Sequence, residues 1–421
     1  MPILVRMRKS LGALTGKPWG TLAGAAAAVL AVAACSPAAR QPARLTVRPV
    51  APVTSTVEHW GAFFGGGPGY SGRAASPATV TLPGTVAKVA SSNSTEYALL
   101  TNGELYAWGL GTQGQLGDGA GQNSFTRPVR VRFPAGVKIA SIPTDVMPFD
   151  TGLAVDTHGH AWGWGHNGGG ELCLGNRKTY RTPVELPFSR VTALAGASNH
   201  TLFDAGGTVY ACGQNLAGSL GDGHTRPSTT PARVARLDGS SVVSLVASFA
   251  NSGALLANGQ YFDWGLNTNG QLGNGHHRSR DVPVRVSLPG PVTQAAQGGS
   301  YWNNGQSLVL LADGSVWAWG SGRAGQLGHG AARSRRSPVR VHLPAGVSYT
   351  NLATGGATSY AVSAAGNVYA WGASHLGQVG NGKTRNALAP VLVASGATAI
   401  SATAGNVVIN VPASRHGPSG A

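Results

Sequence analysis

The sequence predicts an all-β fold, a seven-bladed β-propeller over residues 53–412, and the main reason is an internal repeat. A Trp-Gly pair, or one variant of it, recurs seven times at spacings of 48 to 56 residues, and the later pairs follow short alternating segments. A small sheet cannot bury both of its faces alone, so such units must stack around an axis. The pairs are Trp60-Gly61, Trp108-Gly109, Trp164-Gly165, Cys212-Gly213, Trp264-Gly265, Trp319-Gly320 and Trp371-Gly372.

Each unit carries the signals of four short antiparallel strands. A tight turn such as Ala312-Asp-Gly precedes the alternating segment Ser315-Val-Trp-Ala-Trp, as expected for a hairpin. A Gly-rich hairpin such as Gly270-Gln-Leu-Gly-Asn-Gly follows, and a strand such as Pro283-Val284 closes the unit. We expect the recurring Trp and the Leu of the Gly-rich hairpin to pack between neighbouring blades.

The two ends of the repeat array are incomplete in complementary ways. Trp60 has only Val53 to His59 before it, too little for an upstream inner strand. Ala399 to Val411 reads as an inner strand that no Trp-Gly pair follows. We therefore expect the N- and C-terminal strands to share one blade, which closes the ring.

Two segments, Asp313 to Gly320 and Asn267 to Gly275, match the pattern Asp-Gly-x-Val-Tyr-x-Trp-Gly and then Asn-x-x-Gly-Gln-Leu-Gly-x-Gly almost letter for letter. In these residues the sequence resembles the regulator-of-chromosome-condensation repeat family. The resemblance implies a seven-bladed propeller that serves as an interaction platform. The founding member is a nuclear exchange factor for a small GTPase, and secreted bacterial relatives include β-lactamase inhibitors.

The sequence departs from the family at a position where many repeats carry His-Ser. Only Asn199-His200-Thr201 comes close to that pair, and its counterparts are residues such as Thr95-Glu96 and Thr358-Ser359. An exported protein would also not meet a cytoplasmic GTPase. We therefore do not expect guanine-nucleotide exchange.

Residues 1–34 resemble a lipoprotein signal peptide. Four basic residues up to Lys17 precede an uncharged run from Thr21 to Ala34, which is too short for a confident membrane span. The run ends in Val32-Ala-Ala-Cys35, which is similar to a lipobox, so we expect Cys35 to be lipidated. Secretion with cleavage near Ala33 or Ala34, and an uncleaved anchor, are the alternatives. Residues 35–52 are predicted to form a Pro-rich linker and residues 413–421 a disordered tail.

Composition excludes a disordered chain and a disulfide-stapled scaffold, because 42% of the residues are hydrophobic and only three are cysteines. The formal net charge is +16, from 31 Lys and Arg against 15 Asp and Glu. Basic residues gather beyond the Gly-rich hairpin of every unit after the first, so they should lie around one side of the ring and its outer edge. Ten of them form what we call the basic rim: Arg127, Arg130, Arg181, Arg226, Arg278, Arg280, Arg333, Arg335, Arg336 and Arg385.

The basic rim has two interpretations. It would attract an anionic surface such as membrane headgroups or a phosphate-bearing wall polymer. It would equally serve as a solvated outer edge, because charges on outer strands prevent edge-to-edge pairing.

No motif indicates catalysis, a cofactor or a metal site. Gly109 to Gly114 and Gly320 to Gly325 both fit Gly-x-Gly-x-x-Gly, but they lie in the repeat hairpin and not between a strand and a helix, as a dinucleotide site requires. His158-Gly-His160 and His276-His277 have no partners nearby in sequence for a metal, so we interpret them as exposed loop residues.

Cys173 and Cys212 lie in consecutive units, 39 residues apart. Export would permit a disulfide between them. Because Cys212 replaces a packing Trp, the sequence favours two buried thiols.

We predict a non-enzymatic envelope lipoprotein, held on the extracellular side of the membrane, that binds an unidentified protein on one propeller face. The alternatives are an inhibitor of a secreted enzyme and an exported hydrolase or lyase with a site in the central channel. Tyr301-Trp302 is the candidate contact of an inhibitor, although the sequence favours burial of this pair against the neighbouring blade. Acids or histidines converging on that channel would favour the enzyme, and a channel lined by Gly and Ala would exclude it. We expect a monomer, and export argues against a nucleic-acid partner.

The substitution Cys35→Ala tests the predicted anchor. It should move the protein from the membrane fraction to the soluble fraction, because no thiol would remain for lipidation. Fractionation followed by immunodetection measures this, with Cys35→Ser as a second variant. Unchanged membrane retention of both variants would refute the lipid anchor.

Overall fold

The computed structural model describes residues 55–61, 74–92, 94–143, 147, 150–237, 239–299, 305–403 and 406–411. The predicted signal, linker and tail, with Cys35, lie outside these residues, as do Tyr301 and Trp302. None of the helical structure in the described ranges is long and apolar enough to cross a membrane.

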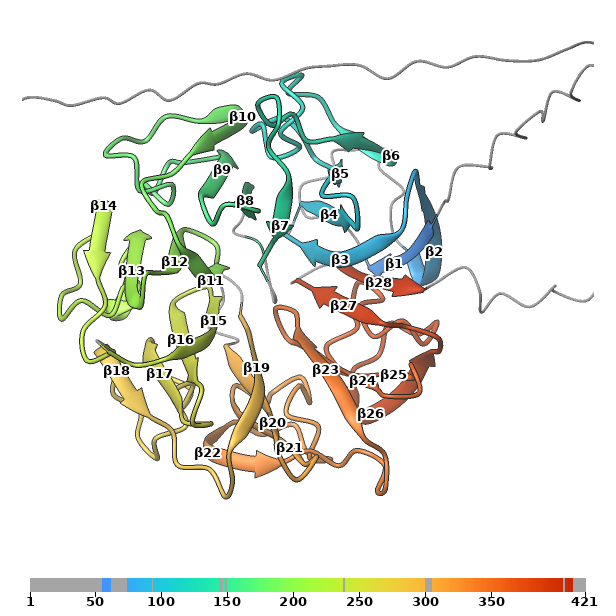
Figure 1. Ribbon diagram of the computed structural model, residues 1–421. Coiled ribbons are helices and arrows are strands. Elements are labelled where there is room, and N and C mark those ends of the chain that lie inside the picture. The colour runs from blue at the N-terminus through green and yellow to red at the C-terminus, as the bar shows by residue number, and fades with distance from the viewer. Residues whose placement is uncertain are drawn as a thin grey trace, which may run out of the picture. The chain divides into compact units, whose positions relative to one another are not determined.

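Seven four-stranded antiparallel sheets surround a common axis, as the sequence predicts (Figure 1). We number the blades along the chain. Blade 1 contains β3 (Val86–Ser91), β4 (Thr95–Leu100), β5 (Leu105–Gly109) and β6 (Ser124–Arg130). Blade 2 contains β7 (Ile139–Ser141), β8 (Thr151–Asp156), β9 (Ala161–Gly165) and β10 (Tyr180–Glu185). Blade 3 contains β11 (Val191–Gly196), β12 (His200–Ala205), β13 (Thr208–Gly213) and β14 (Ser228–Arg233), with the short 3₁₀ helix η1 (Leu216–Gly218) between the last two.

The next three blades repeat this order. Blade 4 contains β15 (Val242–Ser248), β16 (Asn251–Leu256), β17 (Tyr261–Gly265) and β18 (Arg280–Arg285). Blade 5 contains β19 (Val292–Gly298), β20 (Gln306–Leu311), β21 (Val316–Gly320) and β22 (Arg335–Arg340). Blade 6 contains β23 (Tyr349–Thr354), β24 (Thr358–Ser363), β25 (Val368–Gly372) and β26 (Ala387–Ala394).

Blade 7 combines two distant parts of the chain. Its strand order is β2 (Ala74–Leu82), β1 (Ser55–Gly61), β28 (Asn406–Val411) and β27 (Ala399–Ala402). In this sheet Trp60 is paired with Val407 across the β1–β28 ladder. The prediction that N- and C-terminal strands complete one blade is therefore confirmed.

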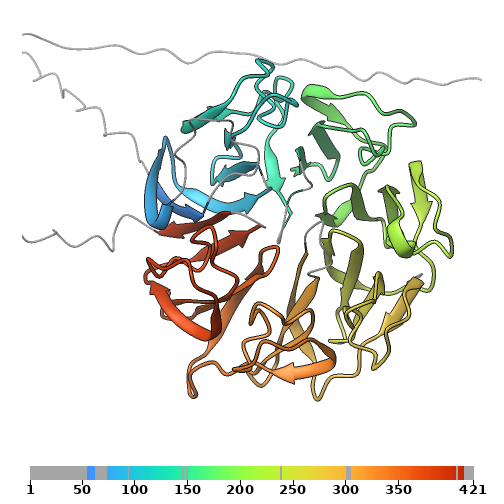
Figure 2. The ribbon, with the colours of Figure 1, turned by 180° about the vertical axis from the view of Figure 1, so that it is seen from behind.

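The antiparallel order gives the ring two different faces (Figures 1 and 2). On one face lie the connections from first to second strand and the Gly-rich hairpins, which are residues 92–94 and 110–123 in blade 1. We call it the hairpin face. The opposite face carries the turns between second and third strands and the connections between blades, residues 101–104 and 131–138 in blade 1. We call it the turn face.

In five of the seven blades the recurring Trp joins the blade to the one before it through a hydrogen bond. Trp319 is fully buried, and its Nε1 donates a hydrogen bond to the carbonyl of Gln271 in the preceding hairpin at 2.8 Å. A Cβ on Gly273 of that hairpin would lie only 2.8 Å from the same Nε1, and Gly273 has φ +59°. The interface therefore requires glycine opposite the indole. Four further indoles make the same contact: Trp60 to Gln378, Trp164 to Gln115, Trp264 to Ser219 and Trp371 to Gln326.

The interface between blades 2 and 3 replaces both partners of this contact by cysteine. Cys212 occupies the Trp position, and Cys173 occupies the position of the facing glycine with φ 60°. Their Sγ atoms form a disulfide, with the Cα atoms 5.4 Å apart. The expectation of two buried thiols is therefore wrong. Loss of the indole leaves room for a side chain at the glycine position, and the two thiols fill that room together.

The interface between blades 4 and 5 contains a buried carboxyl at a position where blade 7 has His59 and the five other blades have Ala or Gly. Asp263 is fully buried and accepts hydrogen bonds from Gln297 Nε2 at 2.5 Å and Ser307 Oγ at 3.3 Å. Burial raises the pKa of Asp263 well above its usual value, against the opposing effect of the Gln297 hydrogen bond. The equivalent residues are Ala107, Gly163, Ala211, Ala318 and Ala370.

Removing the disulfide should lower the free energy of unfolding by about 4 kcal/mol, the loop-entropy value for a closed loop of this length. The variant Cys173→Ala/Cys212→Ala tests this by denaturant unfolding. As a control, Cys173→Gly/Cys212→Trp should recover part of the loss, because it restores the pair found in the other blades. If the alanine variant and the unreduced wild type were equally stable, the disulfide would be contradicted. Recovery of Cys173 and Cys212 in separate peptides from a digest without reducing agent would also contradict it.

Asp263→Asn should stabilise the protein at neutral pH. A carboxyl whose pKa is higher in the folded protein than in the unfolded chain costs stability as the pH rises above the unfolded value of about 3.9. The amide keeps the acceptor for Gln297 and removes the buried charge. Thermal melts should show a higher Tm for the variant at pH 7 and a smaller difference near pH 4. A difference that does not change with pH would show that Asp263 does not titrate in this way.

Candidate functional site

Blades 2 and 5 have longer connections from first to second strand than the other blades, and the strand ends that these connections join lie on the hairpin face. The connection from first to second strand takes only residues 92–94 in blade 1 and 355–357 in blade 6. In blade 2 it spans residues 142–150, and in blade 5 residues 299–305. Insertions in repeat proteins mark loops on one face, and that face is often the binding face. The hairpin face is therefore the first candidate.

Polar side chains gather at the end of the blade 2 insertion. Asp150 accepts a hydrogen bond from Ser94 Oγ in blade 1, and a second one from Gln115 Nε2 at 3.0 Å. Burial raises the pKa of the Asp150 carboxyl, against the opposing effect of the Ser94 hydrogen bond. The cluster thus joins the insertion to the hairpin of the preceding blade.

An acid–base pair lies beside Asp150. His166 Nδ1 is 2.8 Å from Glu171 Oε1, and Glu171 is fully buried. The hydrogen bond that Glu171 accepts from His166 raises the pKa of His166, with Asp150 adding a smaller effect. Glu171 stands where four other hairpins carry Gln, as at Gln115. The sequence analysis missed this pair, and the exchange of Gln for Glu within the repeat was the available signal.

The hydrogen bonds of the cluster do not form a nucleophile–base arrangement. Ser94 Oγ contacts Asp150 and Thr95, whereas the His166 imidazole contacts Glu171. These hydrogen bonds can orient polar groups and hold the His166–Glu171 pair on the hairpin face. It does not activate the Ser94 hydroxyl through an imidazole.

The innermost strands around the axis are almost free of ionisable groups. Among Asp, Glu, His, Lys and Arg, only Lys88 occurs on β3, β7, β11, β15, β19, β23 and β27, all of which are described. Its Nζ donates to the Ile142 carbonyl at 2.6 Å, and burial lowers the pKa of Lys88 to about 8. The described strands therefore bring no acids or histidines together at the axis.

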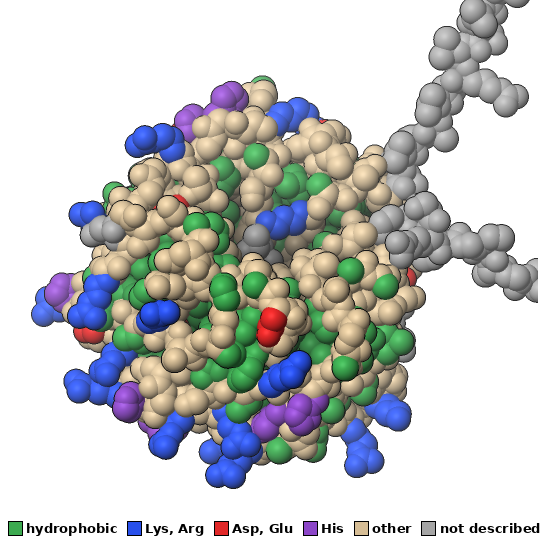
Figure 3. All heavy atoms as spheres, turned by 60° about the horizontal axis from the view of Figure 1, so that its bottom comes forward, with side chains coloured by type: hydrophobic (Ala, Val, Ile, Leu, Met, Phe, Trp, Pro, Cys, Tyr) green, Lys and Arg blue, Asp and Glu red, His purple; other side chains and the backbone are tan. Residues whose placement is uncertain are grey.

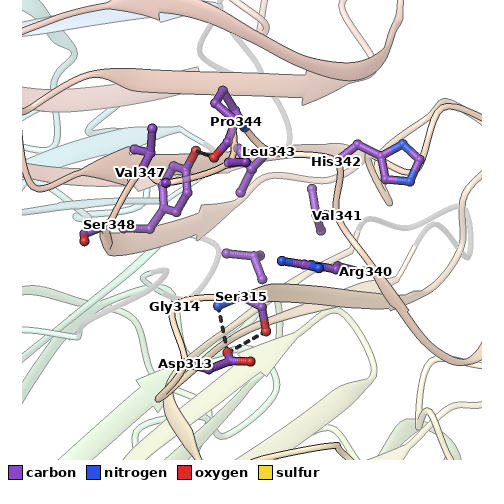
Figure 4. A pocket seen from close by; sticks show the side chains of 14 residues that line it. Asp313, Gly314, Ser315, Arg340, Val341, His342, Leu343, Pro344, Val347 and Ser348 are labelled. Atoms are coloured by element: carbon purple, nitrogen blue, oxygen red, sulfur yellow. Dashed lines mark hydrogen bonds between the residues drawn. The ribbon is translucent and has the colours of Figure 1, made fainter.

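The turn face carries pockets that recur with the repeat. One of them, of about 700 Å³, lies between the β20–β21 turn and the connection from β22 to β23 (Figure 4). Asp313 accepts hydrogen bonds there from the Ser315 N–H and Oγ, and Arg340 and His342 line the same pocket. Equivalent pockets of about 460 Å³ and 290 Å³ occur in blades 1 and 4. This recurrence makes them a product of the repeat geometry rather than a dedicated site.

The basic rim lies on the outermost strands and on the hairpins that lead to them, and blue side chains follow much of the outline in Figure 3. Arg280 and Arg335 are half-buried, and the other eight arginines are exposed. Arg130 forms an ion pair with Glu104 at 2.9 Å, so its charge is compensated. The arginines of the basic rim thus lie at the outer edge, where the sequence places them. Binding of the basic rim to an anionic partner stays a prediction.

The remaining sequence candidates are separated in space. His160 lies within 3.6 Å of Asp156 and 3.7 Å of Glu185, while His276 and His277 are exposed on a hairpin. No three His, Cys, Asp or Glu residues in the described ranges are placed to hold a metal ion. Both Gly-x-Gly-x-x-Gly segments begin at the end of a strand, β5 or β21, and continue into a hairpin.

Comparison with solved structures shows the same fold. Human WBSCR16 superimposes with a TM-score of 0.73 and 20% identity, covering 85% of this chain and 99% of that one. Prp20p from Saccharomyces cerevisiae, whose structure is reported with its binding to Gsp1p and histones, gives a TM-score of 0.70 and 22% identity, covering 85% and 92%.

Curated relatives are similar over two thirds of this chain. The ultraviolet-B receptor UVR8 of Arabidopsis thaliana is 28% identical over 286 residues, which cover 67% of this chain and 63% of the receptor. The E3 ubiquitin-protein ligase HERC2 of Homo sapiens is 29% identical over 289 residues, which cover 67% of this chain and 6% of the ligase. This chain thus spans less than two thirds of either relative.

The model of the "Regulator of chromosome condensation (RCC1) repeat" matches residues 102–143, 158–203, 258–301, 313–362 and 365–407. These segments cover more than half of the chain and include most of the propeller strands described above. The chain therefore belongs to the RCC1 repeat family.

Proposed function

We propose that this chain is an exported, lipid-anchored envelope protein whose propeller binds a protein partner through the hairpin face and catalyses no reaction. The observation that carries the proposal is that the connections from first to second strand are long in blades 2 and 5, and that the strand ends they join lie on this face. A partner seated over the axis would cover both pairs of strand ends, because blades 2 and 5 lie on different sides of the ring (Figure 1).

Related propellers support a protein as the partner. The structure of Prp20p is reported with its binding to Gsp1p and histones, and a structure of yeast RCC1 contains Kap60. Those partners belong to those proteins, and the likeness here is one of fold. What transfers to the proposal is the use of a rigid ring to present loops.

Export is supported by two independent features. The basic start, the apolar run and Cys35 follow the pattern of a lipoprotein signal. The disulfide between Cys173 and Cys212 fits an oxidising compartment, because cytosolic thiols are kept reduced.

The absence of catalysis in this proposal rests on the arrangement of the polar groups. Lys88 alone among the charged residue types lies on the innermost strands, and its Nζ is bonded to a backbone carbonyl. On the hairpin face, His166 is paired with Glu171 instead of with a nucleophile. Inhibition of a secreted enzyme would be one form of protein binding through the same face.

Photo-cross-linking from the two faces tests the proposal. A photoreactive amino acid at Asn199, on the hairpin face between β11 and β12, should cross-link a defined envelope protein in cells. The matched control carries the same group at Ala345, which is exposed on the turn face. We expect a strong adduct from position 199 and at least about tenfold less from position 345.

Two further results decide the interpretation. Tyr301→Ser/Trp302→Ser, in the second insertion, should weaken the adduct from position 199 without lowering Tm. An adduct formed only from position 345, or none from either position in properly exported protein, would contradict the proposal.

A further inference from the structure

We propose that the outer edge of blades 5 and 6 docks on an anionic phospholipid bilayer. The edge consists of Arg333, Arg336, Lys383, Arg385, Leu388 and Leu392, and we call it the arginine–leucine edge. This inference rests on the export and anchoring in the proposed function, since only then does the propeller face a bilayer. It assigns a second surface on the outer side of the ring, which meets the hairpin face at the hairpins of blades 5 and 6.

Charge is concentrated in this part of the ring. Residues 266–403 contain ten Lys and Arg but only two acids, Asp281 and Asp313. The other thirteen acids lie elsewhere in the chain; among the described residues five of them are buried, Glu96, Asp156, Glu171, Asp204 and Asp263, and others such as Glu185 are exposed. The surface potential of this side is therefore more positive than the formal net charge of the chain suggests.

Blade 6 carries leucine at the two positions where blade 5 carries exposed arginine. The Arg336 carbonyl accepts a hydrogen bond from Gly275 of the preceding hairpin at 2.8 Å, and the Leu388 carbonyl accepts the equivalent bond from Gly330 at 3.1 Å. Arg340 is paired with Trp317 across the ladder, and Leu392 is paired with Tyr369 in the same way. Each leucine thus takes the place of an arginine on the next blade.

Both leucines are exposed to solvent. Leu388 is 41% exposed and Leu392 is 58% exposed, and they are two of only four large hydrophobic residues exposed to this extent in the described structure. Two such side chains on one outer strand are a feature that solubility does not explain.

Cations flank the leucines on both sides. The Gly330 bond to Leu388 brings the blade 5 hairpin, which ends next to Arg333, against β26. Lys383 and Arg385 lie in the blade 6 hairpin just before β26 begins at Ala387. Leu388 therefore lies against the blade 5 hairpin, and the chain leads to it directly from Lys383 and Arg385, while Leu392 lies further along the same strand.

An anionic bilayer satisfies both parts of this surface. Lipid phosphates attract the cations, and the apolar boundary below the headgroups accepts leucine side chains. A phosphate-bearing wall polymer would use the cations but leave the leucines in water. A second copy of the chain would cover the leucines but bring like charges together.

Vesicle binding tests the proposal. All proteins carry Cys35→Ala in the full chain, so that no acyl group contributes and residues 1–34 are the same in each. Binding is measured by flotation with vesicles of phosphatidylcholine alone and of phosphatidylcholine with 30% phosphatidylglycerol, at low and high salt. Three variants are compared: Arg333→Gln/Arg336→Gln, Leu388→Gln/Leu392→Gln, and the matched control Arg127→Gln/Arg181→Gln on blades 1 and 2.

Binding should require phosphatidylglycerol. Each surface cation is worth about a factor of five in membrane affinity, so the blade 5 arginine variant should bind roughly 30-fold more weakly. The leucine variant should bind about tenfold more weakly, with a loss that persists at high salt because it is apolar in origin. The control should lose much less, since its arginines lie outside the edge.

Four outcomes would overturn the proposal. Equal binding to both vesicle compositions would remove the anionic requirement, and an equal loss in the control would show a diffuse charge effect. Full binding by the leucine variant would point to a polyanion instead of a bilayer. A concentration-dependent dimer that the leucine variant abolishes, without vesicle binding, would assign the edge to self-association. None of these outcomes would change the photo-cross-link formed from position 199. The proposal that a partner binds the hairpin face is therefore tested independently of this one.

Discussion

The hydrogen bond from one blade's indole to the preceding hairpin carbonyl is the contact on which the ring depends. Trp164 and Trp371 are fully buried, and their Nε1 atoms donate to Gln115 and Gln326 at 2.9 Å. Each contact satisfies a buried polar group and fixes how closely two blades approach. It also explains the second glycine of each Gly-rich hairpin, since a Cβ on Gly328 would lie 2.7 Å from Trp371 Nε1.

A few substitutions at the blade interfaces distinguish individual blades from the common repeat. The disulfide of Cys173 and Cys212 replaces an indole and a glycine, and Asp263 adds a buried carboxyl where five other blades have Ala or Gly. Glu171 brings an acid beside His166 in a hairpin position that is Gln in four other blades. A repeated frame tolerates such changes because each interface involves only two neighbouring blades.

The repeat made the fold predictable, and it made single interfaces hard to predict. Six Trp-Gly pairs, one Cys-Gly variant and two incomplete ends were enough for the blade number and the closure of β1 against β28. Two buried thiols were favoured over a disulfide because Cys212 was compared with the repeat, as a replacement for Trp, and Cys173 was not. Aligned on the repeat, Cys173 falls on the glycine that faces the Trp position. The contacts of Asp150, Ser94 and His166 depend on how an insertion folds back, which no residue spacing encodes.

The central claim is that a partner occupies the hairpin face, and hydrogen exchange of the complex measures it most directly. The account predicts slower exchange on partner binding in residues 92–94, 142–150, 197–199 and 299–305, which connect first to second strands on that face. Residues 131–138 and 341–348 on the turn face should be unchanged. Protection confined to the turn-face segments would contradict the account.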